Sequence, residues 1–268
     1  MDAITLGPLM LPFSRLPGIF ALLALVVTSE VLDKKYPGIA RWGWLTALIA
    51  AVGGRLGFAA MTPSAYWSEP WTLVYFWQPG YSWWAALLAA LIFSGFYWSR
   101  HQQLRKQGAV ILASAAALGL GTLLLLPNTG TGEQLPGLQV FSLEGEEIQL
   151  TDFKGEPLVV NLWATWCPPC RREMPMLESY EEDDRLQVVL INQGESLLAV
   201  QEYLQEDGLE FAALFLDPAQ EAMQLYQAPG LPATLFYNEA GELVDRHFGE
   251  LSRGQIEQFI RRHGRTSD

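Results

Sequence analysis

The sequence predicts two domains of different class, an α-helical membrane domain with four spans followed by an α/β domain. Apolar stretches with few charges fill the chain up to about residue 126. Formal charge then changes sign: residues 1–132 carry 4 Asp and Glu against 8 Lys and Arg, whereas residues 133–268 carry 25 against 9. Short apolar runs then alternate with amphipathic stretches. The predicted boundaries are 1–126 for the membrane domain, 127–137 for a linker and 138–268 for the α/β domain.

Four apolar stretches predict the membrane spans, at 16–32, 40–60, 83–98 and 108–126. A hydrocarbon core about 30 Å thick needs roughly 20 apolar residues in a helix, so the first and third stretches are expected to extend into their flanks. A cleaved signal peptide is not expected, because the N-terminus is acidic and three more apolar stretches follow the first.

The loops between these stretches predict the orientation. The loop at 61–82 has no Lys or Arg and is rich in Trp and Tyr, which is typical of side chains at the headgroup level. Loops that carry positive charge stay in the cytoplasm. The basic residues of the other two loops are Lys34, Lys35, Arg41, Arg100, Arg105 and Lys106. We therefore expect a multi-pass protein of the bacterial cytoplasmic (inner) membrane, in contact with lipids, with its C-terminal domain facing the periplasm.

Arg55 lies inside an apolar stretch, where a guanidinium is costly and often functional. The alternative is a structural arginine that snorkels or pairs with Glu69 or a lipid phosphate. Residues 53–86 resemble part of prolipoprotein diacylglyceryl transferase through "VGGRLGF", Tyr66, Pro70 and "FWQPGYSWWAA". The catalytic histidine of that family falls on Trp84, whose indole cannot accept a proton. Lipid transfer is not expected, and the resemblance suggests a lipid or docking site that includes Arg55 and Tyr66.

The second domain is predicted to follow the order β-β-β-α-β-α-α-β-β-α. Continuous apolar runs predict buried central strands, and Asn238 to Gly241 predict a hairpin turn. The predicted elements are two strands within 138–150, a strand at 157–165, a helix from Cys167 to about 184 kinked at Pro175, a strand at 186–192, helices at 197–208 and 219–227, a hairpin at 233–249 and a helix at 252–264. A strand that ends just before Cys-x-x-Cys fits a thioredoxin-like sheet covered by helices.

Cys167 and Cys170 are the two cysteines of the chain. Thiol exchange needs a thiolate, and the start of a helix stabilises one, so Cys167 is predicted to attack and Cys170 to resolve the mixed disulfide. Pro168 and Pro169 supply no N–H, which raises the expected pKa of the Cys167 thiol and favours a reductant. Neighbouring Arg171 and Arg172 act in the opposite direction.

The chain resembles the TlpA/ResA-type thioredoxin family over nearly all of 133–263. The resemblance is carried by "DFKGEPLVVNLWATWCPPCRREMPMLE", "LINQGES", "FLDPAQEAMQLYQAPGLPATLFYNEAGELV" and "HFGELS". It implies disulfide reduction by a membrane-tethered domain outside the cytoplasmic membrane, commonly in cytochrome c maturation. It also implies that Glu173 handles a proton, that Pro232 is a cis-proline, and that Leu231 offers backbone to a substrate strand. Trp166 is expected at the substrate surface, with rim packing as the alternative.

Other readings of the cysteine pair stay open. A zinc site would need two further ligands, with His101, His247 and His263 as the available histidines. A purely structural disulfide would close a very short loop. A periplasmic thiol oxidase or isomerase, or a tethered binding module, are the alternatives to a reductase. We expect disulfide-bearing protein clients, a DsbD-like or CcdA-like membrane thiol reductase as electron donor, no metal, no cofactor and, given the acidic domain, no nucleic acid.

Overall fold

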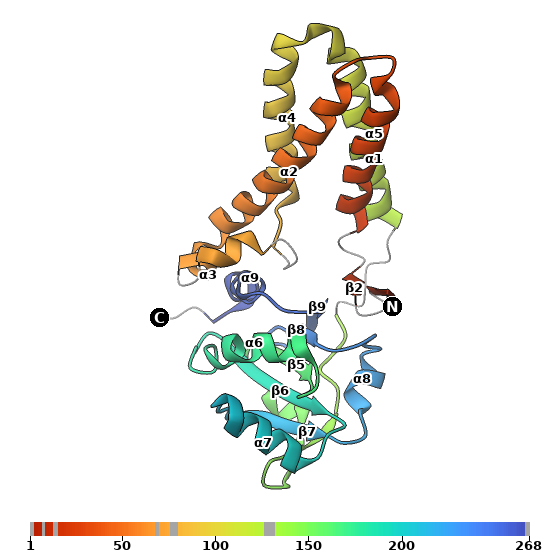
Figure 1. Ribbon diagram of the computed structural model, residues 1–268. Helices are drawn as coiled ribbons and strands as arrows, with labels where there is room; N and C mark the ends of the chain where they lie inside the picture. The colour runs from red at the N-terminus through yellow and green to blue at the C-terminus, as the bar shows by residue number, and fades with distance from the viewer. Residues whose placement is uncertain are drawn as a thin grey trace. The chain divides into compact units, whose positions relative to one another are not determined.

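The computed structural model describes residues 3–6, 9–12, 16–67, 70–75, 80–125 and 132–265. The chain divides into two compact units (Figure 1). One unit comprises Leu11–Pro127, and the other comprises Asn128–Asp268 together with Met1–Met10. Near the N-terminus, β1 (Ala3–Leu6) and β2 (Leu9–Pro12) pair as a two-stranded sheet.

Four long helices form the helical unit. They are α1 (Leu16–Asp33), α2 (Ile39–Met61), α4 (Trp83–Arg100) and α5 (Arg105–Leu125), with the short segments α3 (Pro63–Trp67), η2 (Pro70–Val74) and η3 (Gln102–Leu104) between them. Helix α2 packs against α1 and α4, and α1 packs against α5. The contact between α2 and α4 depends on small residues, because a Cβ added at Gly57 would collide with the Cβ of Ala85.

Three helical segments within the described residues are long and apolar enough to cross a membrane: Leu16–Asp33, Ile39–Met61 and Gln102–Leu125. Helix α4 occupies the place of the remaining predicted span but is not among these three. Its sequence includes Trp83, Trp84, Tyr97 and Trp98, and such amphipathic rings are less apolar than aliphatic chains. The prediction of four spans is therefore supported for three.

The α/β unit is built on a seven-stranded sheet in the order β4-β3-β7-β6-β5-β8-β9. The pairs β5–β6 and β6–β7 are parallel, and the other four neighbouring pairs are antiparallel. The strands are β3 (Gln139–Ser142), β4 (Glu147–Gln149), β5 (Leu158–Trp163), β6 (Gln187–Gln193), β7 (Leu214–Asp217), β8 (Ala233–Tyr237) and β9 (Leu243–Phe248).

Helices cover both faces of this sheet (Figure 1). Helices α6 (Pro168–Glu178), α7 (Leu197–Asp207) and α9 (Arg253–His263) contribute to the buried cluster on one face. Helix α8 (Glu221–Leu225) and the 3₁₀ turn η4 (Leu150–Phe153) contribute to the cluster on the other. All six residues of β5 are buried, as expected for a central strand with helices on both sides.

The structure corrects three details of the predicted elements. Strand β7 was not predicted, because a four-residue apolar run cannot be separated from a loop or a helix by its periodicity. The helix that follows Cys167 ends at Glu178, with Pro175 inside it, rather than near residue 184. Helix α8 covers only Glu221–Leu225 of the predicted 219–227. The first correction completes the sheet by placing a strand between β3 and β6.

Four neighbouring strands have their ends side by side at one end of the sheet, which is called the edge of the sheet in what concerns the cysteines. Strands β5 and β6 end there, since Trp163 pairs with Asn192 in parallel register. Strand β8 starts there, since Ala233 pairs with Leu162, and β9 ends there, since Phe248 pairs with Ala233. Segments that are far apart in sequence therefore meet beyond this edge.

Candidate active site

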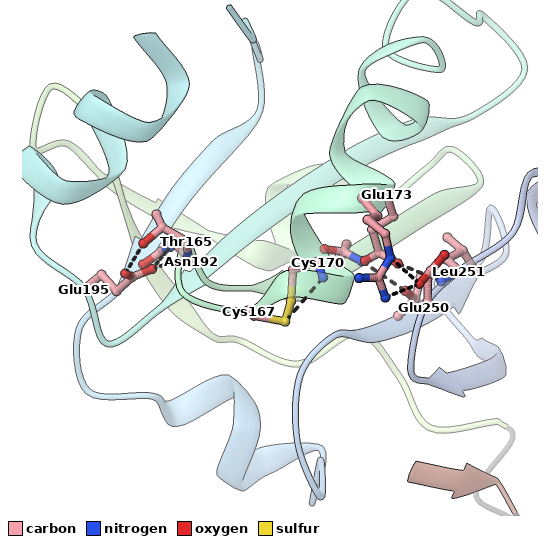
Figure 2. Close-up of a disulfide and its surroundings, with 11 residues drawn as sticks. Thr165, Cys167, Cys170, Glu173, Asn192, Glu195, Glu250 and Leu251 are labelled. Carbon is pink, nitrogen blue, oxygen red and sulfur yellow. Dashed lines mark hydrogen bonds and ion pairs between the residues drawn. A yellow bond between two sulfur atoms is a disulfide. The ribbon is translucent and has the colours of Figure 1, made fainter. Parts of the chain in front are cut away.

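Cys167 and Cys170 form a disulfide at the start of α6 (Figure 2). Cys167 is the N-cap residue, with an extended backbone conformation, and its Sγ accepts a hydrogen bond from the backbone N–H of Cys170 at 3.3 Å. Both cysteines are buried. The unpaired N–H of Cys170 at the start of the helix thus points toward the sulfur, which is an arrangement that stabilises a thiolate.

Two prolines limit how many donors the Cys167 sulfur receives. Pro168 and Pro169 occupy the first two helical positions, where their lack of an N–H costs the helix nothing. The effect of the missing N–H groups is instead that fewer donors are available to the Cys167 sulfur. Within the described part of the chain, the N–H of Cys170 is the one hydrogen-bond donor to it.

Glu173 is a fully buried carboxyl group one turn after Cys170 on α6. Its oxygens accept hydrogen bonds from Asn161 Nδ2 and from the backbone N–H of Leu251, both at 2.7 Å (Figure 2). Burial raises the pKa of Glu173 to about 8, while these two hydrogen bonds act in the opposite direction. Residues three apart on a helix share a face, so this carboxyl lies on the inward face with Cys170.

The charged groups around Glu173 come from α6 and from the segment after β9. Arg172 Nη2 pairs with Glu250 Oε2 at 2.6 Å, and this ion pair is partly exposed. The charge of Glu250 raises the pKa of Glu173 and that of Arg172 lowers it, both less than burial does. A mainly neutral carboxyl is therefore held inside the protein at neutral pH, one helical turn after Cys170.

The Leu231–Pro232 peptide bond is cis. Pro232 is buried and immediately precedes β8, which starts at the edge where β5 ends before the cysteines. The carbonyl oxygen of Pro232 accepts a hydrogen bond from Gly249 N at 2.9 Å, which ties it to the end of β9. The sheet therefore brings the segment of Pro232 and the cysteine motif to the same edge.

Comparison with known proteins agrees with this geometry. The model of the AhpC/TSA family matches residues 131–246. The thiol-disulfide oxidoreductase ResA of Halalkalibacterium halodurans is 35% identical over 133 residues, which cover 48% of this chain and 74% of that protein. The chain belongs to the ResA family of thiol-disulfide oxidoreductases.

A second relative and a solved structure also match the chain. The ResA of Geobacillus kaustophilus is 29% identical over 168 residues, covering 60% of this chain and 96% of that protein. The crystal structure of StoA from Bacillus subtilis matches with 25% identity and a TM-score of 0.40, covering 46% of this chain and 98% of that chain. This ResA-family protein is accordingly a protein-disulfide oxidoreductase with a thioredoxin-like α/β domain.

Trp166 and Leu231, the side chains predicted at the substrate surface of this ResA-family protein, differ in how far they are exposed. Trp166 is 68% exposed directly before Cys167, so it is not part of the core. Trp163, by contrast, is fully buried. Leu231 is half-buried and packs against both hydrophobic clusters. The pair of Trp166 and Leu231 thus presents apolar surface near the disulfide, and its contact with a client stays a prediction.

Arg55 and Tyr66, the residues of the predicted lipid or docking site, belong to the helical unit. The Arg55 guanidinium is buried and lies 5.6 Å from the ring centroid of Tyr66 and the same distance from that of Tyr81. It donates hydrogen bonds to backbone carbonyls of the loop between α2 and α4, namely those of Thr72, Leu73, Tyr75 and Gly80. These contacts organise that loop. Glu69, its suggested partner, lies outside the described residues, and a lipid role stays a prediction.

Two polar residues of the site were not predicted from the sequence. Asn161 lies in β5 and donates to Glu173 and, at 3.1 Å, to the hydroxyl of Thr234. Glu195 follows β6 and accepts hydrogen bonds from Thr165 and Asn192 (Figure 2). The signal for Asn161 was a lone amide inside a continuous apolar strand, where a buried polar group needs a partner. Nothing in the local sequence around Glu195 points to Thr165, which is 30 residues away.

Proposed function

We propose that this protein is a membrane-tethered reductase of disulfides in extracytoplasmic proteins, with Cys167 as the attacking and Cys170 as the resolving sulfur. The observation that carries the direction of electron flow is the single N–H donor on the Cys167 sulfur. Fewer donors stabilise the thiolate less, which makes the dithiol form less stable and the pair more reducing.

Exchange proceeds in two displacement steps. The Cys167 thiolate attacks one sulfur of a client disulfide, forming a mixed disulfide, and the other client sulfur leaves as a thiolate that takes up a proton. Cys170 then loses its proton and displaces the client sulfur from Cys167. Two electrons pass from the cysteine pair to the client, which leaves as a dithiol, and the Cys167–Cys170 disulfide remains.

Glu173 is proposed to accept the Cys170 proton. A thiol has an ordinary pKa near 8.5, and burial raises the pKa of Glu173 to about 8. Transfer between groups of nearly equal pKa costs little free energy. Cys170 is buried, so its proton passes to a nearby group such as Glu173, in the fraction of molecules whose carboxyl is ionised.

The client is proposed to dock on Trp166, on Leu231 and beside Pro232. The exposed indole and the half-buried leucine supply apolar contact area, and the backbone of Leu231 lies just before β8, at the end of the strands, where it can hydrogen-bond with an extended client segment. Apocytochromes awaiting maturation are one such class of disulfide-bearing client, carried over from the family resemblance.

The helical unit is proposed to be the membrane tether, with four spans and the α/β unit in the periplasm. Large apolar side chains on these helices face outward, among them Leu23, Val31, Leu48, Leu56 and Leu124. No cysteine precedes Cys167 in the chain, so these helices cannot carry electrons across the bilayer by thiol exchange. A separate membrane thiol reductase, of the DsbD or CcdA kind, is the proposed donor.

The reduction potential tests the direction of electron flow. We expect a value more negative than roughly −200 mV, toward thioredoxin at about −270 mV and away from DsbA at about −120 mV. Equilibration with glutathione or a reference thioredoxin, followed by quantification of the dithiol, measures it. A DsbA-like value would support the oxidase or isomerase instead.

Trapping identifies clients and donor in one experiment. With Cys170→Ser the mixed disulfide cannot be resolved, so client proteins stay attached to Cys167 and are identified by mass spectrometry. Cys167→Ser is the matched control, which forms no such adducts. Survival of the biological phenotype in Cys167→Ser cells would favour the tethered binding module.

A further inference from the structure

Glu195 accepts three hydrogen bonds, two of them from Thr165, which lies two positions before Cys167. Its Oε2 accepts from the backbone N–H of Thr165 at 2.7 Å and from Asn192 Nδ2 at 2.7 Å. Its Oε1 accepts from the hydroxyl of Thr165 at 2.5 Å. Both carboxylate oxygens are therefore directed at one residue, two positions before Cys167 (Figure 2).

Through Thr165, the hydrogen bonds of Glu195 act on the segment that carries Cys167. Strand β5 ends at Trp163, and α6 starts at Pro168, so Thr165 lies in the short connection that carries Trp166 and Cys167. The other bond that shapes the connection is Cys167 N to Ala164 O at 3.2 Å, between its two ends. Glu195 anchors the connection from outside, through the turn between β6 and α7.

The charge of Glu195 has no cationic partner within the described residues. Its partners are neutral donors, and a hydrogen bond to an ionised group is roughly twice as strong as one between neutral groups. A half-buried carboxylate held in this way restricts the rotation and displacement of Thr165 more than a neutral amide would. An ordinary surface glutamate of α7, such as Glu202, has no such contacts and is exposed.

We infer that Glu195 is a positioning residue for thiol exchange, which holds the Thr165–Cys167 connection so that Trp166 and the Cys167 sulfur are presented together to a client. It does not touch the reacting atoms and acts through Thr165. The inference depends on exchange at Cys167, which the proposed function shares, but not on the direction of electron flow.

The test compares variants of the full-length protein in the reduction of a protein disulfide. Glu195→Ala removes all three bonds, and we expect its kcat/KM to fall by roughly tenfold or more, because small misplacements of reacting groups cost rates of this size. Thr165→Val removes only the hydroxyl bond and is expected to lie between Glu195→Ala and the natural protein. Thr165→Ser keeps a hydroxyl and is expected to restore the rate.

Two controls separate positioning from general stability. Glu202→Gln removes a charge from α7 without touching Thr165 and is expected to leave the rate unchanged. Gly208→Ala destabilises the other end of α7, so a rate loss in Glu195→Ala that equals the loss in an equally destabilised Gly208→Ala protein would overturn the inference. A rate for Glu195→Ala within twofold of the natural protein would also overturn it.

The two Thr165 variants test the positioning role of Glu195 even if Glu195→Ala does not fold. In that case Thr165→Val differs from the natural protein by a single methyl for hydroxyl exchange, Thr165→Ser keeps the hydroxyl, and equal rates in the two variants would reject the positioning role. The natural protein and Glu202→Gln report whether exchange occurs at all, so a failure of the proposed function is seen independently of the role of Glu195.

Discussion

Glu173 shows how the surroundings of one residue change its chemistry. The sequence places an acidic residue in the first turns of a helix, where it would ordinarily be exposed and ionised. In the folded protein the carboxyl is buried beneath the segment after β9, where it contacts Asn161 and the N–H of Leu251. Burial in this position raises the pKa to about 8, so the group can hold and release a proton at neutral pH.

The raised pKa of Glu173 makes stability depend on pH. Between the ordinary value of 4.5 and about 8, the folded protein keeps a proton that the unfolded chain has released. The contribution of Glu173 to stability is therefore complete below pH 4.5 and is lost as pH rises to about 8. We expect Glu173→Gln, which does not titrate, to gain stability relative to the natural protein by about 1.4 kcal/mol per pH unit inside that window.

Hydrogen exchange of the β5 amides, corrected for intrinsic rates, measures this difference in the full-length protein. Glu202→Gln, which removes an exposed carboxyl on α7 and keeps Glu173, serves as control, and its stability difference from the natural protein should not change with pH in the same window. A difference between natural protein and Glu173→Gln that is the same at pH 5 and pH 8 would contradict the raised pKa.

Asn161 is expected to tune the same carboxyl. Its hydrogen bond lowers the pKa of Glu173, so Asn161→Ala should raise that pKa further and move the ascending limb of the rate profile, where Glu173 loses its proton, to higher pH. The pH dependence of kcat/KM for disulfide reduction measures the shift. Thr234→Val is the matched control, because Thr234 contacts Asn161 but no bond joins it to Glu173. A Thr234→Val profile that moves as far as the Asn161→Ala profile would argue against a direct effect.

At the scale of single elements, local signals placed most boundaries of the α/β unit. Helix α7 begins after Ser196, whose side chain accepts a hydrogen bond from Ala199 N, and ends at Gly208 in the left-handed conformation. Helix α9 begins with a capping box of Ser252 and Gln255. These signals act within a few residues, so they are readable from the sequence. Strand β7 carries no such signal and was missed.

Gly208→Ala is expected to destabilise the α/β unit by roughly 1 kcal/mol, because a residue with a Cβ is disfavoured at positive φ. The glycine has φ of 65°, and a Cβ there would meet no neighbour, so backbone conformation alone sets the cost. Thermal unfolding measures it. Gly137→Ala is the control, since that glycine is not at positive φ and its added Cβ would lie 3.9 Å from the nearest atom, and its midpoint should not move. Equal midpoints for the two variants would contradict the prediction.

At the scale of the whole molecule, the orientation predicted from loop charges is open to direct measurement. Single cysteines introduced into a Cys167→Ser, Cys170→Ser background can be probed with a membrane-impermeant maleimide in spheroplasts. We expect Ser64→Cys and Glu133→Cys to react in intact spheroplasts, because both lie on the predicted periplasmic side. Lys35→Cys and Gln103→Cys should react only after permeabilisation.

The same experiment decides whether α4 crosses the membrane. With four spans, Gln103 lies in the cytoplasm and Glu133 outside. If α4 stayed at the surface, three spans would remain and Glu133 would lie on the opposite side from the N-terminus. Labelling of Gln103→Cys in intact spheroplasts, or protection of Glu133→Cys, would therefore reject the four-span topology.

The sequence by itself determined the features that depend on neighbours along the chain. Apolar length predicted the long helices, alternation and buried runs predicted most strands, and the spacing of Cys167 and Cys170 before an amphipathic helix predicted the redox pair and its place at the helix start. Each of these signals acts over a few residues, so no knowledge of the fold was needed.

Tertiary structure alone decided which distant residues serve the cysteines. The edge of the sheet brings together the ends of β5 and β6, the start of β8 and the end of β9. Through this arrangement Glu195 reaches Thr165, Leu251 reaches Glu173, and Pro232 meets Gly249. The hydrogen bonds of Glu195 with Thr165 and of Glu173 with Leu251 join residues 30 and 78 apart in the sequence, and the burial that raises the pKa of Glu173 exists only once these segments have packed together.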